Sequence, residues 1–460
     1  MKVFPPDFVW GTATSSYQIE GAHDKDGKGP SIWDAFCSIP GKIKNGNTGE
    51  VAIDHYHKIK EDVALIKSLG FNAYRFSISW PRIMPQGRGK VNEAGIDFYN
   101  TLIDELLAHG ITPWITLYHW DLPLALQLEL DGWMGREIID CYAAYARLCF
   151  ERFGDRVKNW ITLNESWVVA ILGHGQGVFA PGRVSNAEPY QVAHNLILSH
   201  AHAVKIFREE FSHQGGIIGI TNNCDWREPL TDSIDDQKAA ERALLFFVGW
   251  FADPIFLGDY PQVMKDRLGA RLPVFTQEEK SMIKGSSDFF GLNHYTTMYA
   301  AENYGKITSG SVYGNGGISE DQDVDLSIDK SWELTEMNWA VVPWGCRKLL
   351  MWIKDRYDNP PIYITENGCA YNDKVDGNGV HDQKRIEFYD GYLNACHEAI
   401  EQGVNLKGFF AWSLFDNFEW ASGYSLRFGI NFINYETLER IPKDSAMWWK
   451  NIVKNNGISQ

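Results

Sequence analysis

Two glutamates in this 460-residue chain follow apolar, β-rich stretches. Residues 157–166 read VKNWITLNES and contain Glu165, and residues 361–368 read PIYITENG and contain Glu366. A single carboxylate at the end of a strand is often a loop cap or an ion-pair partner. Two carboxyl groups about 5–5.5 Å apart can instead cleave a glycosidic bond with retention, one as nucleophile and one as general acid and then base. We predict that the two glutamates share one such site.

Other stretches of the same kind end in side chains that suit a sugar ligand. Carboxylates and amides pair with hydroxyl groups, and tryptophan rings stack on the C–H face of a sugar. The residues in these positions are Gln18, Glu20, Arg75, His119, Trp120, Asn164, Asn293, Tyr295, Asn367, Trp412, Glu419 and Trp420.

These residues lie in or just after eight runs that are rich in β-branched and aromatic residues. The runs cover 8–18, 72–80, 112–120, 159–165, 217–223, 288–296, 361–367 and 407–417. Amphipathic segments with helical spacing, such as 59–70 and 95–110, separate the runs and end in glycine. No linker rich in Gly, Ser or Pro divides the chain. We therefore predict an α/β fold, a single (β/α)8 TIM barrel over residues 1–460, with long loops at the C-terminal face of the strands, where such barrels hold their active sites.

Four of the expected loops are unusually long, at 37–50, 174–190, 301–331 and 371–382. The segment 301–331 is polar and rich in glycine, and it follows the sixth predicted strand. Two interpretations stay open for it, a mobile surface loop and a lid over the substrate.

Composition restricts the partners and the compartment. The net charge of −16 disfavours nucleic acid and anionic membrane surfaces, whereas small-molecule substrates and a homo-oligomer stay open. The first residues, MKVFPPDFVWG, lack the apolar core of a secretion signal, and the most apolar window, 243–251, is too short to span a bilayer. The seven scattered cysteines form no CxxC pair, so we expect a reduced, cytoplasmic protein.

No metal site or other cofactor is predicted. The HxH pairs His55/His57 and His200/His202 have no accompanying carboxylate set, and the second pair falls in a helical pattern that turns its two rings apart. The segment DKVDGNG at 373–379 lacks the ligand spacing and the closing glutamate of a calcium loop.

Seven stretches, taken in order, identify a family. They read FVWGTATSSYQIEG, RFSISWPRI, TLYHWDLP, TLNE, ITENG, AWSLFDNFEW and GYSLRFGI. With them the chain strongly resembles the glycoside hydrolase family 1 β-glucosidases over essentially its full length. The resemblance implies a retaining hydrolase of cellobiose-like oligosaccharides and of aryl or alkyl β-glucosides, with glucose, fucose and galactose all open as the sugar released.

The resemblance also implies a role for each candidate residue. Glu165 would be the acid/base and Glu366 the nucleophile, with Arg75 and Tyr295 beside Glu366. Gln18, His119, Asn164, Glu419 and Trp420 would hold the hydroxyls of the glycone, Trp412 would be the stacking floor, Trp120 and Asn293 would complete the inner shell, and Trp339 would flank the leaving group.

Alternatives within the same fold are a 6-phospho-β-glucosidase and a non-catalytic sugar-binding barrel. The carboxylate of Glu419 would repel a 6-phosphate, and the chain keeps both glutamates, so both alternatives are disfavoured. Trp167 and Leu172 resemble residues that narrow the entrance in glucose-tolerant members. They predict tolerance to glucose, although both side chains could instead simply pack the helix after the fourth strand.

Overall fold

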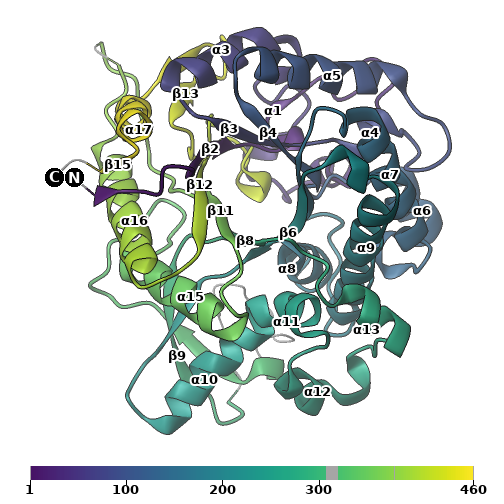
Figure 1. Cartoon of the computed structure of the whole chain (residues 1–460), viewed down its shortest axis with the longest axis vertical. Coiled ribbons are helices and arrows are strands. Elements are labelled where there is room, and N and C mark those ends of the chain that lie inside the picture. The colour runs from purple at the N-terminus through teal and green to yellow at the C-terminus, as the bar shows by residue number, and fades with distance from the viewer. Residues whose placement is uncertain (1, 307–319, 378, 459–460) are drawn as a thin grey trace.

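The computed structural model describes residues 2–306, 320–377 and 379–458. Eight parallel strands close into a barrel in the order β11-β12-β2-β3-β4-β5-β6-β8 (Figure 1). Their bounds are β2 (Val9–Ala13), β3 (Ala73–Ser77), β4 (Thr112–Tyr118), β5 (Asn159–Asn164), β6 (Ile217–Asn223), β8 (Phe290–Asn293), β11 (Ile362–Asn367) and β12 (Leu406–Trp412). The predicted (β/α)8 barrel is confirmed.

Helices surround the barrel and connect its strands. The longer ones are α3 (Ile59–Leu69), α5 (Glu93–Ala108), α7 (Ile138–Phe153), α9 (Glu188–Glu210), α10 (Ile234–Leu244), α11 (Trp250–Leu257), α15 (Pro343–Arg356), α16 (Gln383–Glu401) and α17 (Asp444–Asn455). In α3, the apolar positions that repeat at helical spacing are buried against the barrel, and Gly70 ends the helix with a φ of 85°. The helix that the sequence pattern of 59–70 predicts is therefore present, and its apolar face is the buried one.

Aromatic rings fill the interior of the barrel. The ring of Trp114 lies 4.7 Å from that of Tyr363, 5.3 Å from Phe410 and 5.7 Å from Phe289, measured between centroids. Trp412 belongs to the same buried cluster. A packed interior of this kind leaves the carboxyl ends of the strands as the open face of the barrel.

Two of the predicted runs extend five residues beyond the end of their strands. The run 8–18 is a strand only as far as Ala13, and the short helix α1 (Ser16–Ile19) follows it. The run 407–417 stops at Trp412, which forms the last pair with Ala13. Beyond this pair the two chains leave the barrel rim and lose their strand neighbours, so residues with high β-propensity take other conformations.

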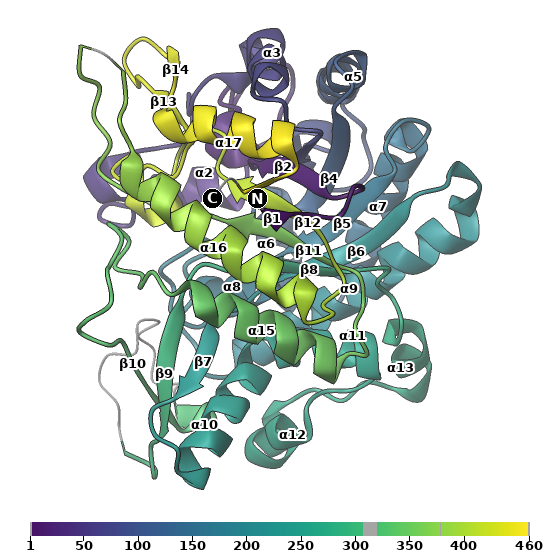
Figure 2. The same ribbon diagram turned by 60° about the vertical axis from the view of Figure 1, so that its left-hand side comes forward.

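A second, three-stranded sheet was not predicted. It has the order β10-β9-β7, with β7 (Trp226–Pro229), β9 (Thr297–Glu302) and β10 (Val324–Ser327) (Figure 2). Part of the segment 301–331 is therefore a strand and not a loop. Its residues 307–319 lie outside the described residues, so the choice between surface loop and lid stays a prediction.

Two general features bear on the composition arguments. All seven cysteines are buried free thiols. Among the described residues, no single helix is long and apolar enough to cross a membrane, and the bent pair Ile234–Leu257 and Gln262–Arg271 meets that test only when its two parts are joined across 120°.

Candidate active site

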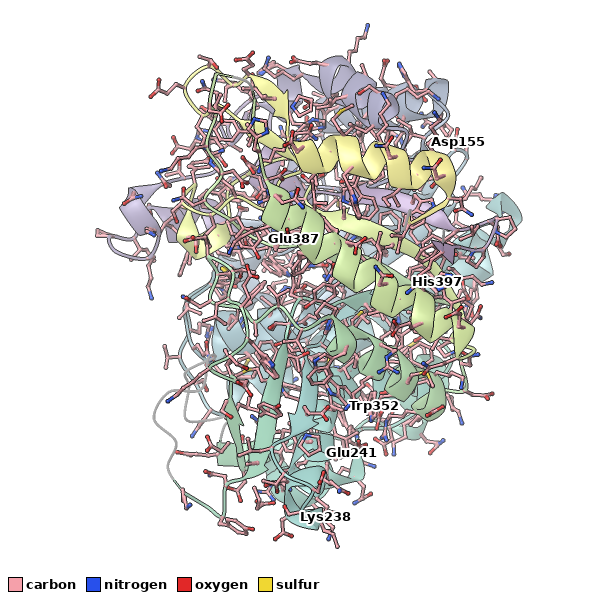
Figure 3. The ribbon with its side chains drawn as sticks, turned by 90° about the vertical axis from the view of Figure 1, so that its left-hand side faces the viewer. Asp155, Lys238, Glu241, Trp352, Glu387 and His397 are labelled. Atoms are coloured by element: carbon pink, nitrogen blue, oxygen red, sulfur yellow. The ribbon has the colours of Figure 1, made fainter. Side chains whose placement is uncertain are left out.

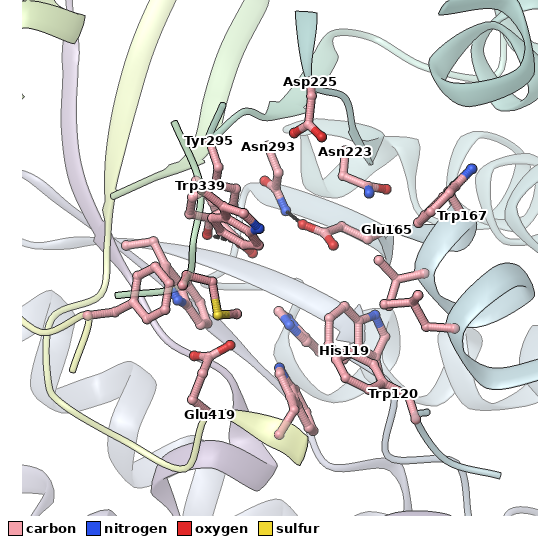
Figure 4. Close-up of a pocket in the computed structure, with 18 residues that line it drawn as sticks. His119, Trp120, Glu165, Trp167, Asn223, Asp225, Asn293, Tyr295, Trp339 and Glu419 are labelled. Atoms are coloured by element: carbon pink, nitrogen blue, oxygen red, sulfur yellow. Dashed lines mark hydrogen bonds between the residues drawn. The ribbon is translucent and has the colours of Figure 1, made fainter. Parts of the chain in front are cut away.

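The carboxyl ends of the barrel strands surround a pocket of about 680 Å³ (Figure 4). Of the predicted site residues, all except Gln18, Glu20, Arg75, Asn164 and Asn367 line this pocket. The lining set contains both glutamates together with His119, Trp120, Trp167, Leu172, Asn293, Tyr295, Trp339, Trp412, Glu419 and Trp420. Residues that are far apart in the sequence thus meet at one place.

Arg75 lies on β3 beneath the pocket, and its side chain is fully buried. Its guanidinium donates to Glu366 Oε1 at 2.7 Å, to Asn164 Oδ1 at 2.6 Å and to Thr116 Oγ1 at 3.0 Å. A further bond reaches the carbonyl oxygen of Thr365 at 2.9 Å. A buried charge is tolerated only when it is paired and hydrogen-bonded, so Glu366 is the counter-ion that this arginine requires.

The contact with Arg75 fixes the orientation of the Asn164 amide. A guanidinium only donates, so the oxygen of Asn164 must face it, and Nδ2 is then the atom 3.1 Å from His119 Nε2. Nε2 accepts this bond, which leaves the imidazole proton on Nδ1. Burial, and then the charge of Arg75, lowers the pKa of His119 well below its usual value, so the ring is neutral.

Asn293 at the end of β8 holds Glu165. Its Nδ2 donates to Glu165 Oε1 at 2.6 Å and to Asn164 Oδ1 at 3.1 Å (Figure 4). Its own oxygen accepts a bond from the Thr365 hydroxyl at 2.7 Å. In the described part of the chain, no cationic side chain pairs with Glu165. Burial, and then the neighbouring charge of Glu366, raises the pKa of Glu165 well above its usual value.

Glu366 has a different environment. Burial raises its pKa as well, but the charge of Arg75 and the hydrogen bond from Tyr295 oppose that effect. The Tyr295 hydroxyl donates to Glu366 Oε2 at 2.7 Å. Glu366 therefore releases its proton before Glu165 does. The two carboxyls thus differ in acidity, although they belong to a single hydrogen-bonded network.

Aromatic faces form much of the pocket wall. The rings of Trp412 and Trp420 each lie 17° from parallel with the ring of His119, at centroid distances of 5.9 and 6.0 Å. Trp120 lies 4.6 Å from Trp420. Flat apolar faces of this kind stack well against the C–H side of a sugar ring.

Glu419 and His119 offer unpaired polar atoms to the pocket. Among the described residues, neither Glu419 Oε2 nor His119 Nδ1 has a hydrogen-bond partner, although both atoms are buried. Burial, and then the charge of Glu366, raises the pKa of Glu419 to about 8. An unpaired donor and an unpaired carboxyl in one pocket suit a ligand with hydroxyl groups, which can both give and accept hydrogen bonds.

Three pocket residues have a left-handed backbone. The φ angles are 80° at Trp120, 50° at Glu165 and 47° at Trp420. Bulky non-glycine residues rarely adopt this region, and each instance costs about 1–3 kcal/mol. Such strain concentrates at functional sites, so the backbone conformation, like the side chains, indicates that this pocket is a functional site.

Sequence reasoning missed several lining residues. Asn223 ends β6 and Asp225 follows it (Figure 4). The polar residues that end the run 217–223 could have marked this part of the site, because polar residues at strand ends mark the other predicted site residues. Phe179, Met337 and Phe428 come from connecting segments, where no periodic pattern marks a residue as part of a site.

Contrary to the sequence prediction, Gln18 and Glu20 do not lie at the end of a strand. Gln18 lies on α1, where its amide donates to the carbonyl of Phe418 at 2.9 Å. Glu20 is outside the pocket lining, because it pairs with Arg82 at 2.9 Å and accepts a bond from Tyr99 at 2.8 Å. The turn from β2 into α1 moves both residues away from the strand direction.

Comparison with known proteins agrees with this geometry. Residues 1–458 match the model of Glycosyl hydrolase family 1. The chain belongs to glycosyl hydrolase family 1. It shares 48% identity with β-glucosidase 44 of Arabidopsis thaliana over 98% of this chain and 91% of the relative. It shares 48% identity with β-glucosidase A of Thermotoga maritima over 100% of this chain and 99% of the relative.

A solved structure is similar to this chain in both fold and sequence. It is a mutant of the rice Os3BGlu6 β-glucosidase in a covalent complex with Glc, with a TM-score of 0.93 and 46% identity over 97% of this chain and 98% of the other. Because these β-glucosidases match the chain over nearly its whole length, we conclude that this protein is an O-glycosyl hydrolase with β-glucosidase activity.

The substitution Glu419→Gln is expected to remove a pH dependence of stability. The folded-state pKa of about 8 lies above the ordinary 4.5, so the folded protein holds this proton more tightly than the unfolded chain does. The associated stability is complete below the unfolded pKa and is lost as the pH rises toward the folded pKa. Between pH 5 and 8.5, the variant should gain about 2–4 kcal/mol relative to the wild type in urea unfolding.

The matched control is Glu436→Gln, which changes an exposed glutamate. Its unfolding free energy should follow that of the wild type across the whole pH range. If the Glu419→Gln curve also runs parallel to the wild type, the raised pKa of Glu419 is refuted.

Proposed function

We propose that the chain is a retaining β-glucosidase with Glu366 as nucleophile and Glu165 as acid/base. It removes terminal non-reducing β-D-glucosyl residues from cellobiose-like oligosaccharides and from aryl or alkyl β-glucosides, and accepts β-D-fucosides and β-D-galactosides. The observation that carries the proposal is the unequal environment of the two carboxyls, since among the described residues only Glu366 has a cationic partner.

In the first half of the reaction, the ionised Glu366 attacks the anomeric carbon while Glu165 gives its proton to the departing oxygen. The bond to the leaving group breaks, the aglycone leaves as an alcohol, and glucose is held as an ester of Glu366. Arg75 and Tyr295 support this step, because both donate to the carboxylate before it attacks.

In the second half, Glu165 takes a proton from water, which attacks the same carbon and releases Glu366. Esterification removes the negative charge of Glu366, and this charge is one cause of the raised pKa of Glu165. The pKa of Glu165 therefore falls when the residue has to act as a base. Two inversions return the β configuration.

The polar side chains of the pocket favour an unphosphorylated sugar as the substrate. The carboxyl of Glu419 and the neutral imidazole of His119 would pair with glycone hydroxyls above the stacking face of Trp412. A 6-phosphate near the Glu419 carboxyl would meet repulsion whenever that group is ionised. The covalent Glc complex of the rice relative supports an ester intermediate.

We propose a reducing compartment, the cytoplasm, for this enzyme. Seven buried thiols without a disulfide support that setting. The expected partners are small β-glycosides, and no nucleic acid or membrane partner is proposed, given the net charge of −16.

Chemical rescue tests the two roles. Glu165→Ala and Glu366→Ala should each lower the hydrolysis of p-nitrophenyl β-D-glucoside by about 10³-fold or more. Azide should rescue Glu165→Ala to give the β-glucosyl azide, because the ester with Glu366 still forms. It should rescue Glu366→Ala to give the α-glucosyl azide by a single inversion. Product configuration is read by NMR.

Rescue with the opposite configurations would reverse the two roles. Wild-type enzyme that ignores the glucoside but cleaves its 6-phosphate would refute the substrate assignment. Glu129→Gln, an exposed carboxyl substitution far from the pocket, should keep the wild-type rate.

We also propose tolerance to glucose. Trp167 (Figure 4) and Leu172 both line the pocket. The Trp167 ring packs 4.6 Å from Phe247, which supports a narrow, apolar entrance. Such an entrance would hinder a free glucose molecule from settling on the leaving-group side of the pocket.

Half-inhibition by glucose should require concentrations well above ~1 mM, the upper end of ordinary KM values. Trp167→Ala and Leu172→Ala should lower that concentration severalfold, whereas Val184→Ala at an exposed position should not. Half-inhibition of the wild type at low-millimolar glucose would end this part of the proposal.

A further inference from the structure

A second hollow lies outside the barrel, between the three-stranded sheet and α15. It is open to solvent and has a volume of about 750 Å³, and we name it the side trough. Its floor is formed by Glu228 on β7 and Tyr299 on β9, which are paired in register. Helix α15 packs against β7 (Figure 2). Its residues Trp344, Arg347 and Lys348 form one wall of the side trough. The loop 229–232 forms the other wall.

The frame around the side trough is tightly built. A Cβ on Gly345 of α15 would come within 1.9 Å of Thr297 Oγ1 on β9, so helix and strand are in close contact. Further along α15, the indole N–H of Trp352 donates to Glu241 of α10 at 2.8 Å (Figure 3). The wall formed by α15 is therefore held in place by packing and by a hydrogen bond.

Partly exposed aromatic rings gather at the side trough. Trp332 stacks on Tyr299 at a centroid distance of 4.9 Å and 22°, and it meets Trp344 edge-on at 6.0 Å. The ammonium of Lys348 lies 5.0 Å from the Trp344 ring. Each of the three residues is of intermediate exposure, so part of each side chain is accessible to solvent.

Several polar atoms of the side trough are unused. Within the described part of the chain, neither the Trp344 indole N–H nor the Tyr299 hydroxyl has a hydrogen-bond partner, and the carboxylate of Asp232 likewise has none. Arg347 makes only a 3.5 Å ion pair with Glu398. Lys348, by contrast, is engaged by Glu228 at 2.6 Å. Donors and acceptors thus stand beside apolar faces, the combination that binds a sugar.

The charges of the lining select a neutral ligand. Glu228 and Asp232 balance Arg347 and Lys348. These four charges sum to zero, so the lining as a whole attracts neither an anion nor a cation. A β-linked glucan is neutral, presents flat C–H faces to aromatic rings and carries hydroxyls along both edges.

We infer that the side trough is a non-catalytic binding site for a neutral β-glucan chain. It is a second site beyond the proposed function, connected to the active pocket by two chain segments. One runs from Tyr295 to Tyr299 and the other from Trp339 to Trp344. A glucan held in the side trough keeps its chain near the enzyme between rounds of hydrolysis.

Affinity electrophoresis in native gels with barley β-glucan tests the inference. The background is Glu165→Gln, which leaves the ion pair between Arg75 and Glu366 intact, with the active pocket filled by saturating deoxynojirimycin. We expect retardation relative to a gel without glucan. Trp344→Ala and Tyr299→Ala should each raise the apparent Kd about fivefold or more. Trp344→Phe and Tyr299→Phe, which keep a ring, should retain most of the retardation.

Tyr304→Ala removes an exposed tyrosine that is not part of the side trough, and it should behave as the background does. In the otherwise native enzyme, Trp344→Ala should hydrolyse p-nitrophenyl β-D-glucoside within about twofold of the wild type. This rate separates loss of the trough from loss of the fold or of the proposed activity.

Absence of retardation, or full retardation of Trp344→Ala, would overturn the inference. So would retardation that disappears when deoxynojirimycin fills the active pocket, because binding would then occur there. Retardation in the gel, together with a wild-type enzyme that hydrolyses no glucoside, would leave this inference standing and refute the proposed function instead.

Discussion

The buried charge of Arg75 is the constraint on which the site depends. A guanidinium inside a closed barrel needs a counter-charge and acceptors in fixed directions. Glu366 supplies the charge, and Thr116, Asn164 and the carbonyl of Thr365 supply the remaining acceptors. The arginine therefore favours ionisation of one carboxyl, orients one amide and, through that amide, sets the proton position on a neutral imidazole.

The barrel makes this arrangement possible because neighbouring and distant strands end at one face. Arg75 comes from β3, Thr116 from β4, Asn164 from β5, and both Thr365 and Glu366 from β11. Closure of the barrel brings their ends together, and the aromatic rings inside it support the layer below the pocket. The asymmetry between the two carboxyls is thus a consequence of strand order and not of any single motif.

The sequence predicted the barrel and most of the pocket because the chemistry stands at strand ends, where a repeated pattern marks it. Glu165 and Glu366 were found in this way, and Asn223 could have been. Position along a strand did not reveal backbone strain at Trp120, nor that Glu20 would turn toward Arg82. These features arise from tertiary packing beyond the strand ends, where local propensity no longer decides the conformation.

The accessory sheet shows the same limit on a larger scale. Strand β9 follows β8 closely, and β10 lies in a polar segment that reads as a loop, so no boundary pattern separated them. Their pairing depends on a neighbour, β7, that is distant in sequence. The trough beside this sheet follows from that pairing and could be found only in three dimensions.

The decisive measurement is the pKa of Glu165 before and after Glu366 is trapped as a 2-deoxy-2-fluoroglucosyl ester. It can be followed by NMR of protein labelled at the glutamate side-chain carboxyl carbon, with the ester located by peptide mass spectrometry. The coupling between the two carboxyls predicts a fall in the pKa of Glu165 once the charge of Glu366 is removed. An unchanged pKa, or an ester on any residue other than Glu366, would contradict the mechanism.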